Sequence, residues 1–164
     1  MASALATKLA KLKKQQAAVE KEMANVAKAA FKEMSAEVFK ANPALISFSW
    51  SQYTPYWNDG DTCTFSSNAE YPSITFKASD GKTVKNDENN GTLVFFDAGD
   101  TDVEYEVPED EYDKYTKQIE KLNVKVSSFL GNFSDDDFLT MFDDHQLITV
   151  NRNGKVETED YEHE

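Results

Sequence analysis

Apolar residues recur at alternating intervals of four and three along the first quarter of the chain. From Ser3 to about Ala41 the sequence has no Gly or Pro and consists mainly of Ala, Lys, Glu, Gln and Leu, all good helix formers. The spacing is that of a coiled-coil seam with one polar position, and it comprises Leu5, Leu9, Leu12, Gln16, Val19, Met23 and Val26. We therefore predict a long N-terminal helix that self-associates through these seven residues.

The predicted helix is longer than a small domain can cover. About 39 residues at a rise of 1.5 Å per residue give a rod of about 58 Å. The seam shifts by one position after Ala30, and Asn42-Pro43 ends the helix because proline disfavours the α conformation in the residue before it. Gln16 would cost stability but could fix the register or the number of associating helices. The alternative interpretation is a helix that folds back onto its own domain.

The middle of the chain alternates between apolar and polar residues, which is typical of half-buried β-strands. Asp80-Gly81 has the composition of a hairpin turn. The apolar run at 93–96 is continuous, which indicates a central strand. Strands are predicted around residues 46–50, 62–65, 74–76, 93–96 and 103–107.

Two shorter helices and a hairpin are expected in the last third of the chain. Pro108 suits the first position of the second helix, whose seam from Tyr112 to Phe129 could pack against the first helix, and Gly131 is expected to cap it. A capping box starts the third helix at Ser134 with Asp137, and this helix is expected to end near His145. The C-terminal hairpin spans 147–158, with a type I′ turn predicted at Asn153-Gly154.

These elements predict an α+β fold in two parts. Residues 1–42 form the self-association helix, and residues 43–164 form a small antiparallel β-sheet domain with two further helices and a C-terminal hairpin. No run of 18 apolar residues and no signal-peptide pattern is present. Because Cys63 is the only cysteine, an internal disulfide is excluded, and we expect a reduced, cytoplasmic location.

Charge is distributed unevenly between the two parts. The whole chain carries −13, whereas residues 1–41 carry +4 from eight Lys and four Glu. Residues 42–164 hold nine basic residues against 26 acidic ones, which gives −17. Such a domain repels nucleic acid phosphates and anionic membranes, so neither is expected as a partner. The acidic surface could instead steer a basic protein partner, or it could serve solubility alone.

The densest group of aromatic residues lies between residues 50 and 61. Aromatic faces with a few polar groups suit a planar or cationic ligand, through stacking and cation–π attraction. The alternative is that these residues form core and a hairpin turn. The candidate ligand-binding residues, with a histidine from the C-terminal part, are Trp50, Gln52, Tyr53, Tyr56, Trp57, Asp59, Asp61 and His145.

Signals for metal binding or catalysis are weak. The Asp59-Gly60-Asp61 segment resembles part of a calcium loop, but the position that needs glycine is Thr64. The acidic run 135–137 is explained by a helix N-terminus, where carboxylates are favoured by the helix dipole. Nucleophile-elbow, Walker and dinucleotide-binding motifs do not occur in the sequence. We therefore expect no metal, no cofactor and no enzymatic activity, with a metal-dependent enzyme using Asp59, Asp61 and His145 as the third choice.

Two segments contain residue patterns that are specific enough to compare with a known protein family. The first is Trp50-x-Gln52-Tyr53-Thr54-Pro55-Tyr56-x-Asn58-Asp59-Gly60-Asp61-x-Cys63-x-Phe65, and the second comprises Phe142-x-Asp144-His145, Arg152-x-Gly154 and Tyr161-x-His163. Both resemble segments of a family of uncharacterised bacteriophage proteins. This resemblance implies a phage setting, with the host cytoplasm as the location, and it implies no activity.

Together these observations predict a non-catalytic phage accessory protein. It is expected to be a homo-oligomer whose acidic domains bind a host or phage protein. The alternative is a small-ligand or nucleotide-binding protein, with a sponge-like role, that uses the aromatic segment 50–61.

Overall fold

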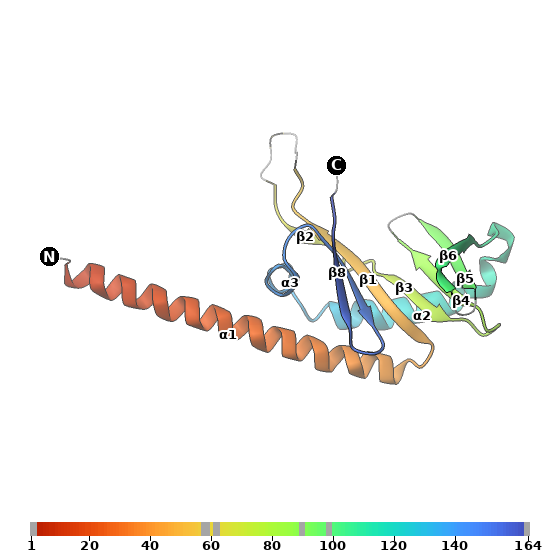
Figure 1. Ribbon diagram of the computed structural model, residues 1–164, viewed down its shortest axis with the longest axis horizontal. Helices are drawn as coiled ribbons and strands as arrows, with labels where there is room; N and C mark the ends of the chain where they lie inside the picture. Colours follow the sequence, from red (N-terminus) through yellow and green to blue (C-terminus); the bar gives the residue numbers. More distant parts are fainter. Residues whose placement is uncertain (1–2, 57–59, 61–62, 89–90, 98–99, 163–164) are drawn as a thin grey trace.

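The computed structural model describes residues 3–56, 60, 63–88, 91–97 and 100–162 of the chain. A long helix is followed by an antiparallel sheet, two shorter helices and a C-terminal hairpin, so the predicted α+β class is confirmed (Figure 1). The helices are α1 (Ala4–Ala41), the 3-10 helix η1 (Glu109–Glu111), α2 (Asp113–Leu130) and α3 (Asp135–Phe142). The strands are β1 (Leu45–Tyr53), β2 (Ser66–Ser67), β3 (Ser73–Lys77), β4 (Thr83–Asp87), β5 (Thr92–Asp97), β6 (Asp100–Glu106), β7 (Gln146–Asn151) and β8 (Val156–Asp160).

All strand pairs in the described part of the chain are antiparallel. The order across the sheet is β6-β5-β4-β3-β1-β7-β8, and β2 pairs with the last two residues of β1. The pairing of β1 with β7 joins the first strand of the sheet to the C-terminal hairpin, with Trp50 opposite Ile148. This long-range pairing brings the end of β1, with the predicted residues Gln52 and Tyr53, next to the turn between α3 and β7, which holds His145.

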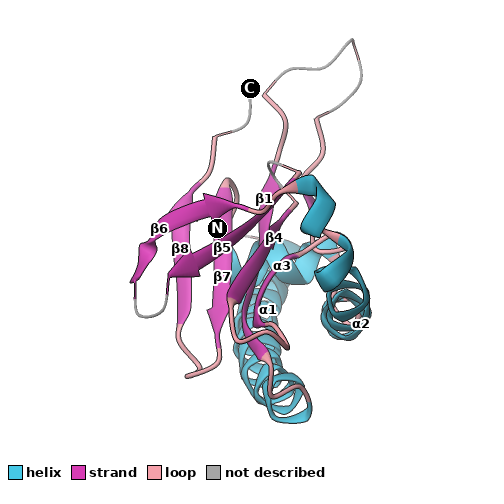
Figure 2. Cartoon of the chain, turned by 90° about the vertical axis from the view of Figure 1, so that its right-hand side faces the viewer, coloured by secondary structure: helices cyan, strands magenta, loops and turns pink. Residues whose placement is uncertain are grey.

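The three helices gather on one face of the sheet (Figure 2). Alternate residues of β1 point to this face because side chains of a strand alternate between its two sides. The Phe48 ring lies 5.9 Å from Phe129 of α2, and the Trp50 ring lies 5.4 Å from Phe138 of α3. Phe31 of α1 contacts the same group, 6.0 Å from Trp50. The core is therefore an aromatic cluster between the central strands and all three helices.

Helix α1 belongs to this core through its C-terminal part, from about Ala27 onward. Phe31, Ser35 and Phe39 are buried, whereas the helix before them extends away from the domain (Figure 1). The side chain of Ser3 accepts a hydrogen bond from the Ala6 N–H and caps the start of the helix. The interpretation of a helix that folds onto its own domain therefore applies to this C-terminal part, and the core crosses the predicted boundary at residue 42.

Among the described residues, no helix lies across the other face of the sheet (Figure 2). In β1, Ser47, Ser49 and Ser51 point to this face and alternate with the core positions Phe48 and Trp50. The strand pairing shows that glutamates of both edge strands point to this same face. These are Glu104 and Glu106 of β6, and Glu157 and Glu159 of β8, all four exposed. Acidic side chains on edge strands also disfavour pairing with another sheet.

Several local predictions differ from the structure. Residues 63–65 are not a strand, and β2 begins only at Ser66. The turn at Asn153-Gly154 is not type I′, because that turn needs positive φ at both central residues and only Gly154 has it. Gly131 caps α2 with an ordinary right-handed φ of −64°, and η1 separates Pro108 from α2. The third helix ends at Phe142, and β5 lies next to the edge strand β6 rather than centrally.

Candidate functional site

Gln52 ties the end of β1 to the segment around α3. It is fully buried, and its amide nitrogen donates to the carbonyl oxygens of Phe138 (3.0 Å) and Asp143 (2.6 Å). Its amide oxygen accepts from the indole nitrogen of Trp50 at 3.1 Å. Because a buried polar group is costly unless it is paired, this set of hydrogen bonds fixes one position of α3 relative to β1.

Asp144 makes the second connection between the two segments. One carboxylate oxygen accepts from the backbone N–H groups of Thr54 and His145, both at 2.8 Å, and the other accepts from the Thr54 hydroxyl at 2.6 Å. Burial raises the pKa of Asp144, but the hydrogen bonds from Thr54 and His145 favour the carboxylate and lower the pKa below its ordinary value. The site therefore holds a fixed negative charge at neutral pH.

The side chain of His145 stacks on Tyr56. The ring centroids are 4.7 Å apart and the planes are inclined by 3°, while the imidazole Nε2 lies 3.7 Å from Asp144 Oδ2. His145 has a φ of 53° and Asp143 a φ of 67°, values that side chains with a Cβ rarely adopt. The turn between α3 and β7 is thus held in a strained conformation that presents His145 to Tyr56.

The predicted ligand-binding residues divide into three groups. Trp50 and Gln52 are 2% and 0% exposed and belong to the core, so their faces are not accessible to a ligand in this structure. Tyr53, Tyr56 and His145 lie at the surface end of β1, where Tyr53 contacts the ring of Tyr161 at 5.7 Å. The structure brings Tyr56 and His145 together. The remaining candidates lie outside the described residues: Trp57, Asp59 and Asp61.

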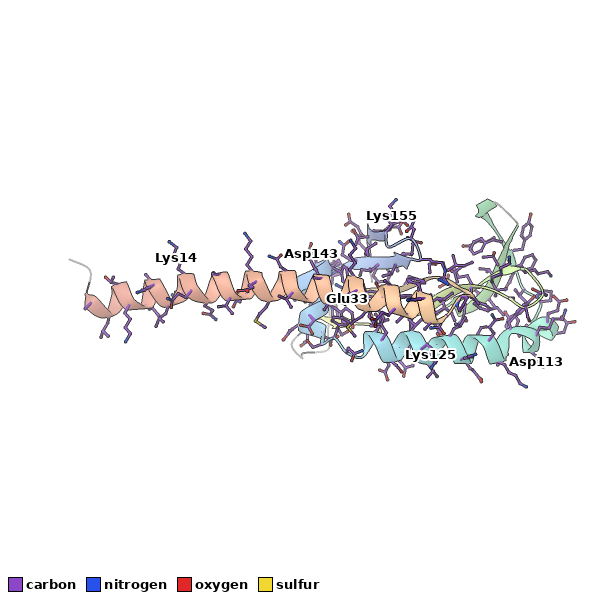
Figure 3. All side chains as sticks on the ribbon, turned by 90° about the horizontal axis from the view of Figure 1, so that it is seen from below. Lys14, Glu33, Asp113, Lys125, Asp143 and Lys155 are labelled. Carbon is purple, nitrogen blue, oxygen red and sulfur yellow. The ribbon has the colours of Figure 1, made fainter. Side chains whose placement is uncertain are left out.

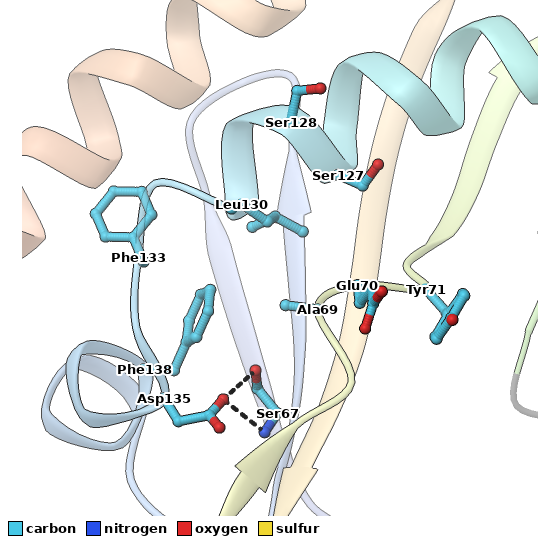
Figure 4. Close-up of a pocket in the computed structure, with 11 residues that line it drawn as sticks. Ser67, Ala69, Glu70, Tyr71, Ser127, Ser128, Leu130, Phe133, Asp135 and Phe138 are labelled. Atoms are coloured by element: carbon cyan, nitrogen blue, oxygen red, sulfur yellow. Dashed lines mark hydrogen bonds between the residues drawn. The ribbon is translucent and has the colours of Figure 1, made fainter.

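A cavity between β2, the end of α2 and the start of α3 was not anticipated (Figure 4). It has a volume of about 610 Å³ and an apolar floor that includes Leu130 and Phe138. At one side Asp135 accepts hydrogen bonds from the backbone N–H and the hydroxyl of Ser67, at 3.1 and 2.9 Å. Glu70 is the other ionisable acid in its lining, which includes no Lys or Arg. The 68-residue separation of Ser67 from Asp135 hides this site from sequence patterns.

The N-terminal part of α1, up to about Val26, carries an apolar surface that the described residues leave exposed. Its stripe of six large apolar residues is 51% to 78% exposed, and the polar position Gln16 is exposed as well. In Figure 3, Lys14 lies on this N-terminal part and Glu33 on the part that runs along the domain. The six residues are Leu5, Leu9, Leu12, Val19, Met23 and Val26. We call this set the α1 stripe.

The α1 stripe leads into a groove beside the turn between α2 and α3. Val19, Met23 and Val26 line the groove from α1, and Phe133 and Asp137 line it from the domain, around a cavity of about 450 Å³. Its walls are more apolar than those of the cavity at Ser67 and Asp135.

Within the described residues, no cluster of three His, Cys, Asp or Glu side chains has a geometry that could hold a metal ion. The acidic run 135–137 instead forms the first turn of α3, where Ser134 and Asp137 make the predicted capping box. Among the described helices, none combines the length and the apolar character needed to cross a membrane. Comparisons with protein-family models, with curated proteins and with solved structures found no match to this chain.

Proposed function

We propose that the protein is a non-catalytic interaction module that self-associates through α1 and presents acidic domains to a protein partner. The observation that carries the proposal is the α1 stripe, whose six apolar side chains are 51% to 78% exposed on a helix in which every described residue up to Met23 is exposed. A contiguous apolar surface of this kind is a typical mark of a protein–protein contact. Its heptad spacing suits another helix.

The uncovered face of the sheet supports the second part of the proposal. Ser47 and Ser49 form its centre, and Glu104, Glu106, Glu157 and Glu159 lie on its two edge strands. The register also places Lys77, Lys85, Val94 and Phe96 on this face, so its acidic character comes from the two edge strands. Carboxylates at both edges suit a basic protein surface, with attraction that speeds association. In the setting that the phage resemblance implies, this partner would be a host or phage protein.

Self-association is tested by measuring mass against concentration with analytical ultracentrifugation. Leu12→Asp places a charge in the α1 stripe and should shift the protein to monomer. Ala18→Asp is the matched control, because Ala18 lies on the same helix away from the stripe and the introduced residue is the same. A wild-type protein that stays monomeric at all concentrations would contradict the proposal.

Partner binding is tested by capture from infected and uninfected cells. We expect wild-type bait to retain a basic protein that a Glu157→Gln, Glu159→Gln double variant retains less well. Glu33→Gln, Glu37→Gln on α1 gives a control with the same change in net charge. Equal retention by both variants would count against the uncovered face as the binding surface.

A second candidate function is binding of a small planar ligand beside Tyr56 and His145. The observation that favours it is their stacked pair, of which Tyr56 is 65% exposed. Asp144 makes the surroundings negative, so a planar cation suits them better than a nucleotide. A thermal shift with a ligand panel that includes both classes should disappear in Tyr56→Ala. No shift with any ligand would contradict this candidate.

A further inference from the structure

The charged residues that flank the α1 stripe change sign along the helix. With Leu5, Leu12, Val19 and Val26 at position d of the heptad, the flanking e and g positions hold Lys8 and Lys13 in the first half of the stripe. In the second half, the same flanking positions hold Glu20 and Glu22. All four side chains are exposed, so none is committed to the domain. The edges of the stripe are therefore basic toward the N-terminus and acidic toward the domain.

This distribution of charge has opposite effects on the pairing of two α1 helices, depending on whether they run parallel or antiparallel. In a parallel pair, each g position lies beside the next e position of the other helix, which places Lys8 beside Lys13 twice. In an antiparallel pair, e faces e and g faces g. When Leu9 faces Val26 and Leu12 faces Met23, the e positions pair Lys13 with Glu20 on both sides of the contact. Like charges oppose the parallel pair, and opposite charges favour the antiparallel one.

The acidic domains favour the same direction. Residues 42–164 carry −17, from nine basic and 26 acidic residues. A parallel pair would hold two such domains at the same end of the helices, where their charges repel each other. An antiparallel pair holds them at opposite ends, because each domain is attached to the C-terminal end of its α1 (Figure 1).

The groove beside Phe133 continues the contact surface beyond α1 itself. Val26 and Phe133 form part of its lining. In the antiparallel pair with Leu9 opposite Val26, the first turns of the second helix lie along this groove. In a parallel pair, the segment of the second helix beside this groove would be the one around Val19–Val26. Leu5 and Leu9 of the second helix would then lie too far away to reach it.

We propose that the α1 stripe is covered by α1 of a second copy running in the opposite direction, with Lys13 beside Glu20 of the second copy and the N-terminal turns in the groove at Phe133. This inference rests on the proposed self-association and names its partner, direction and register. The result is a two-fold symmetric dimer in which each copy makes the same contacts.

The direction is tested on the full-length chain by a distance between two spin labels. The variant is Ala4→Cys in a Cys63→Ser background, labelled with a nitroxide and measured by double electron–electron resonance. In the proposed register the two labelled positions are 27 residues apart along the helix axis, or about 40 Å at 1.5 Å per residue. A parallel pair places them across one coiled coil, below about 25 Å. That shorter distance would overturn the inference and leave self-association standing.

The charge pairing is tested by the dimer dissociation constant. Lys13→Glu should weaken the antiparallel dimer several-fold, because it places two carboxylates together, and adding Glu20→Lys should restore the affinity. In a parallel pair Lys13→Glu would strengthen association, since it replaces the contact of Lys8 with Lys13 by an attractive one. Lys14→Glu, with the same charge change away from the stripe, is the control. An unchanged or stronger dimer for Lys13→Glu contradicts the inference, whereas a wild-type monomer contradicts the proposed function itself.

Discussion

The imidazole of His145 lies parallel to the phenol ring of Tyr56, with 4.7 Å between their centroids. The two residues are separated by most of the domain in sequence, and they meet because β1 pairs with β7. Gln52 and Asp144 hold the two chain segments together behind the stack. The stacked pair is thus the surface end of a buried polar network, and the two parts are expected to respond differently to mutation.

Tyr56→Ala should change the environment of His145 with little loss of stability. Tyr56 is 65% exposed, so the stack is expected to contribute less than about 1 kcal/mol to the free energy of unfolding. Removing the ring also removes its shielding, so the imidazole protons of His145 should move downfield in the NMR spectrum. Tyr71→Ala is the control, because Tyr71 is equally exposed. A His145 signal that stays in place would show that the stack does not persist in solution.

Gln52→Leu should be strongly destabilising. The substitution removes the hydrogen bonds that the Gln52 amide makes with the carbonyl oxygens of Phe138 and Asp143 and with the indole N–H of Trp50. A buried group that loses its partner costs about 1–3 kcal/mol, so a loss of at least about 3 kcal/mol in urea unfolding is expected. Gln146→Leu tests the same change at the position paired with Gln52 in β7, where the side chain is only partly buried. Its smaller loss would show that burial causes the difference.

Asp143→Gly should stabilise the protein. Asp143 has a φ of 67° and a ψ of 170°, a region that is essentially restricted to glycine. Relief of this strain is expected to exceed the entropy cost of a glycine and to add about 1 kcal/mol to the free energy of unfolding. Asp143→Ala removes the same charge but keeps a Cβ, so it should show no such gain. Equal stability of the two variants would mean that the backbone is not strained here.

The sequence predicted elements well where the deciding interactions are local. Ser3 and Asn42 bound α1 as expected, because capping and proline effects act within one turn of helix. Ser134 and Asp137 are three residues apart, and their capping box was predicted correctly for the same reason. Residues 63–65 were predicted as a strand from alternation alone, but alternation does not supply a partner strand.

The arrangement of the sites depends on contacts between distant residues, and sequence patterns reveal these less well. The contact of Tyr56 with His145 was not predicted from the residues themselves. The two residues were linked only because both lie in motifs that resemble segments of the same protein family. Ser67 and Asp135 gave no signal, because a serine and an aspartate separated by 68 residues are ordinary surface residues until the fold brings them together. Trp50 was assigned both to a ligand site and to the core, and the contacts with Phe31 and Phe138 place it in the core.

Arg152→Ala should loosen the attachment of α1 to the domain. The guanidinium group donates two hydrogen bonds to the carbonyl oxygen of Phe39, at 2.7 and 2.9 Å, and one to that of Asn42 at 3.0 Å. A cation at a helix C-terminus also interacts favourably with the helix dipole. We expect a loss of about 1–3 kcal/mol, with faster hydrogen exchange in residues 36–41. Lys155→Ala, in the same hairpin, should leave that exchange unchanged.

Tyr115→Phe should remove a pH dependence of stability in the alkaline range. Burial, together with the 2.7 Å hydrogen bond from the Tyr115 hydroxyl to Asp80, raises the pKa of Tyr115 from 10.0 to about 12. Because the folded-state pKa is the higher one, the stabilising contribution is complete below pH 10 and is lost as the pH rises towards 12. The wild type should therefore lose stability between pH 10 and 12 more steeply than Tyr115→Phe, as measured by urea unfolding at each pH. Parallel pH profiles of the two proteins would contradict the role assigned to this hydroxyl. Tyr112→Phe is the control, because Tyr112 lies one turn earlier at the start of α2 and is only partly buried.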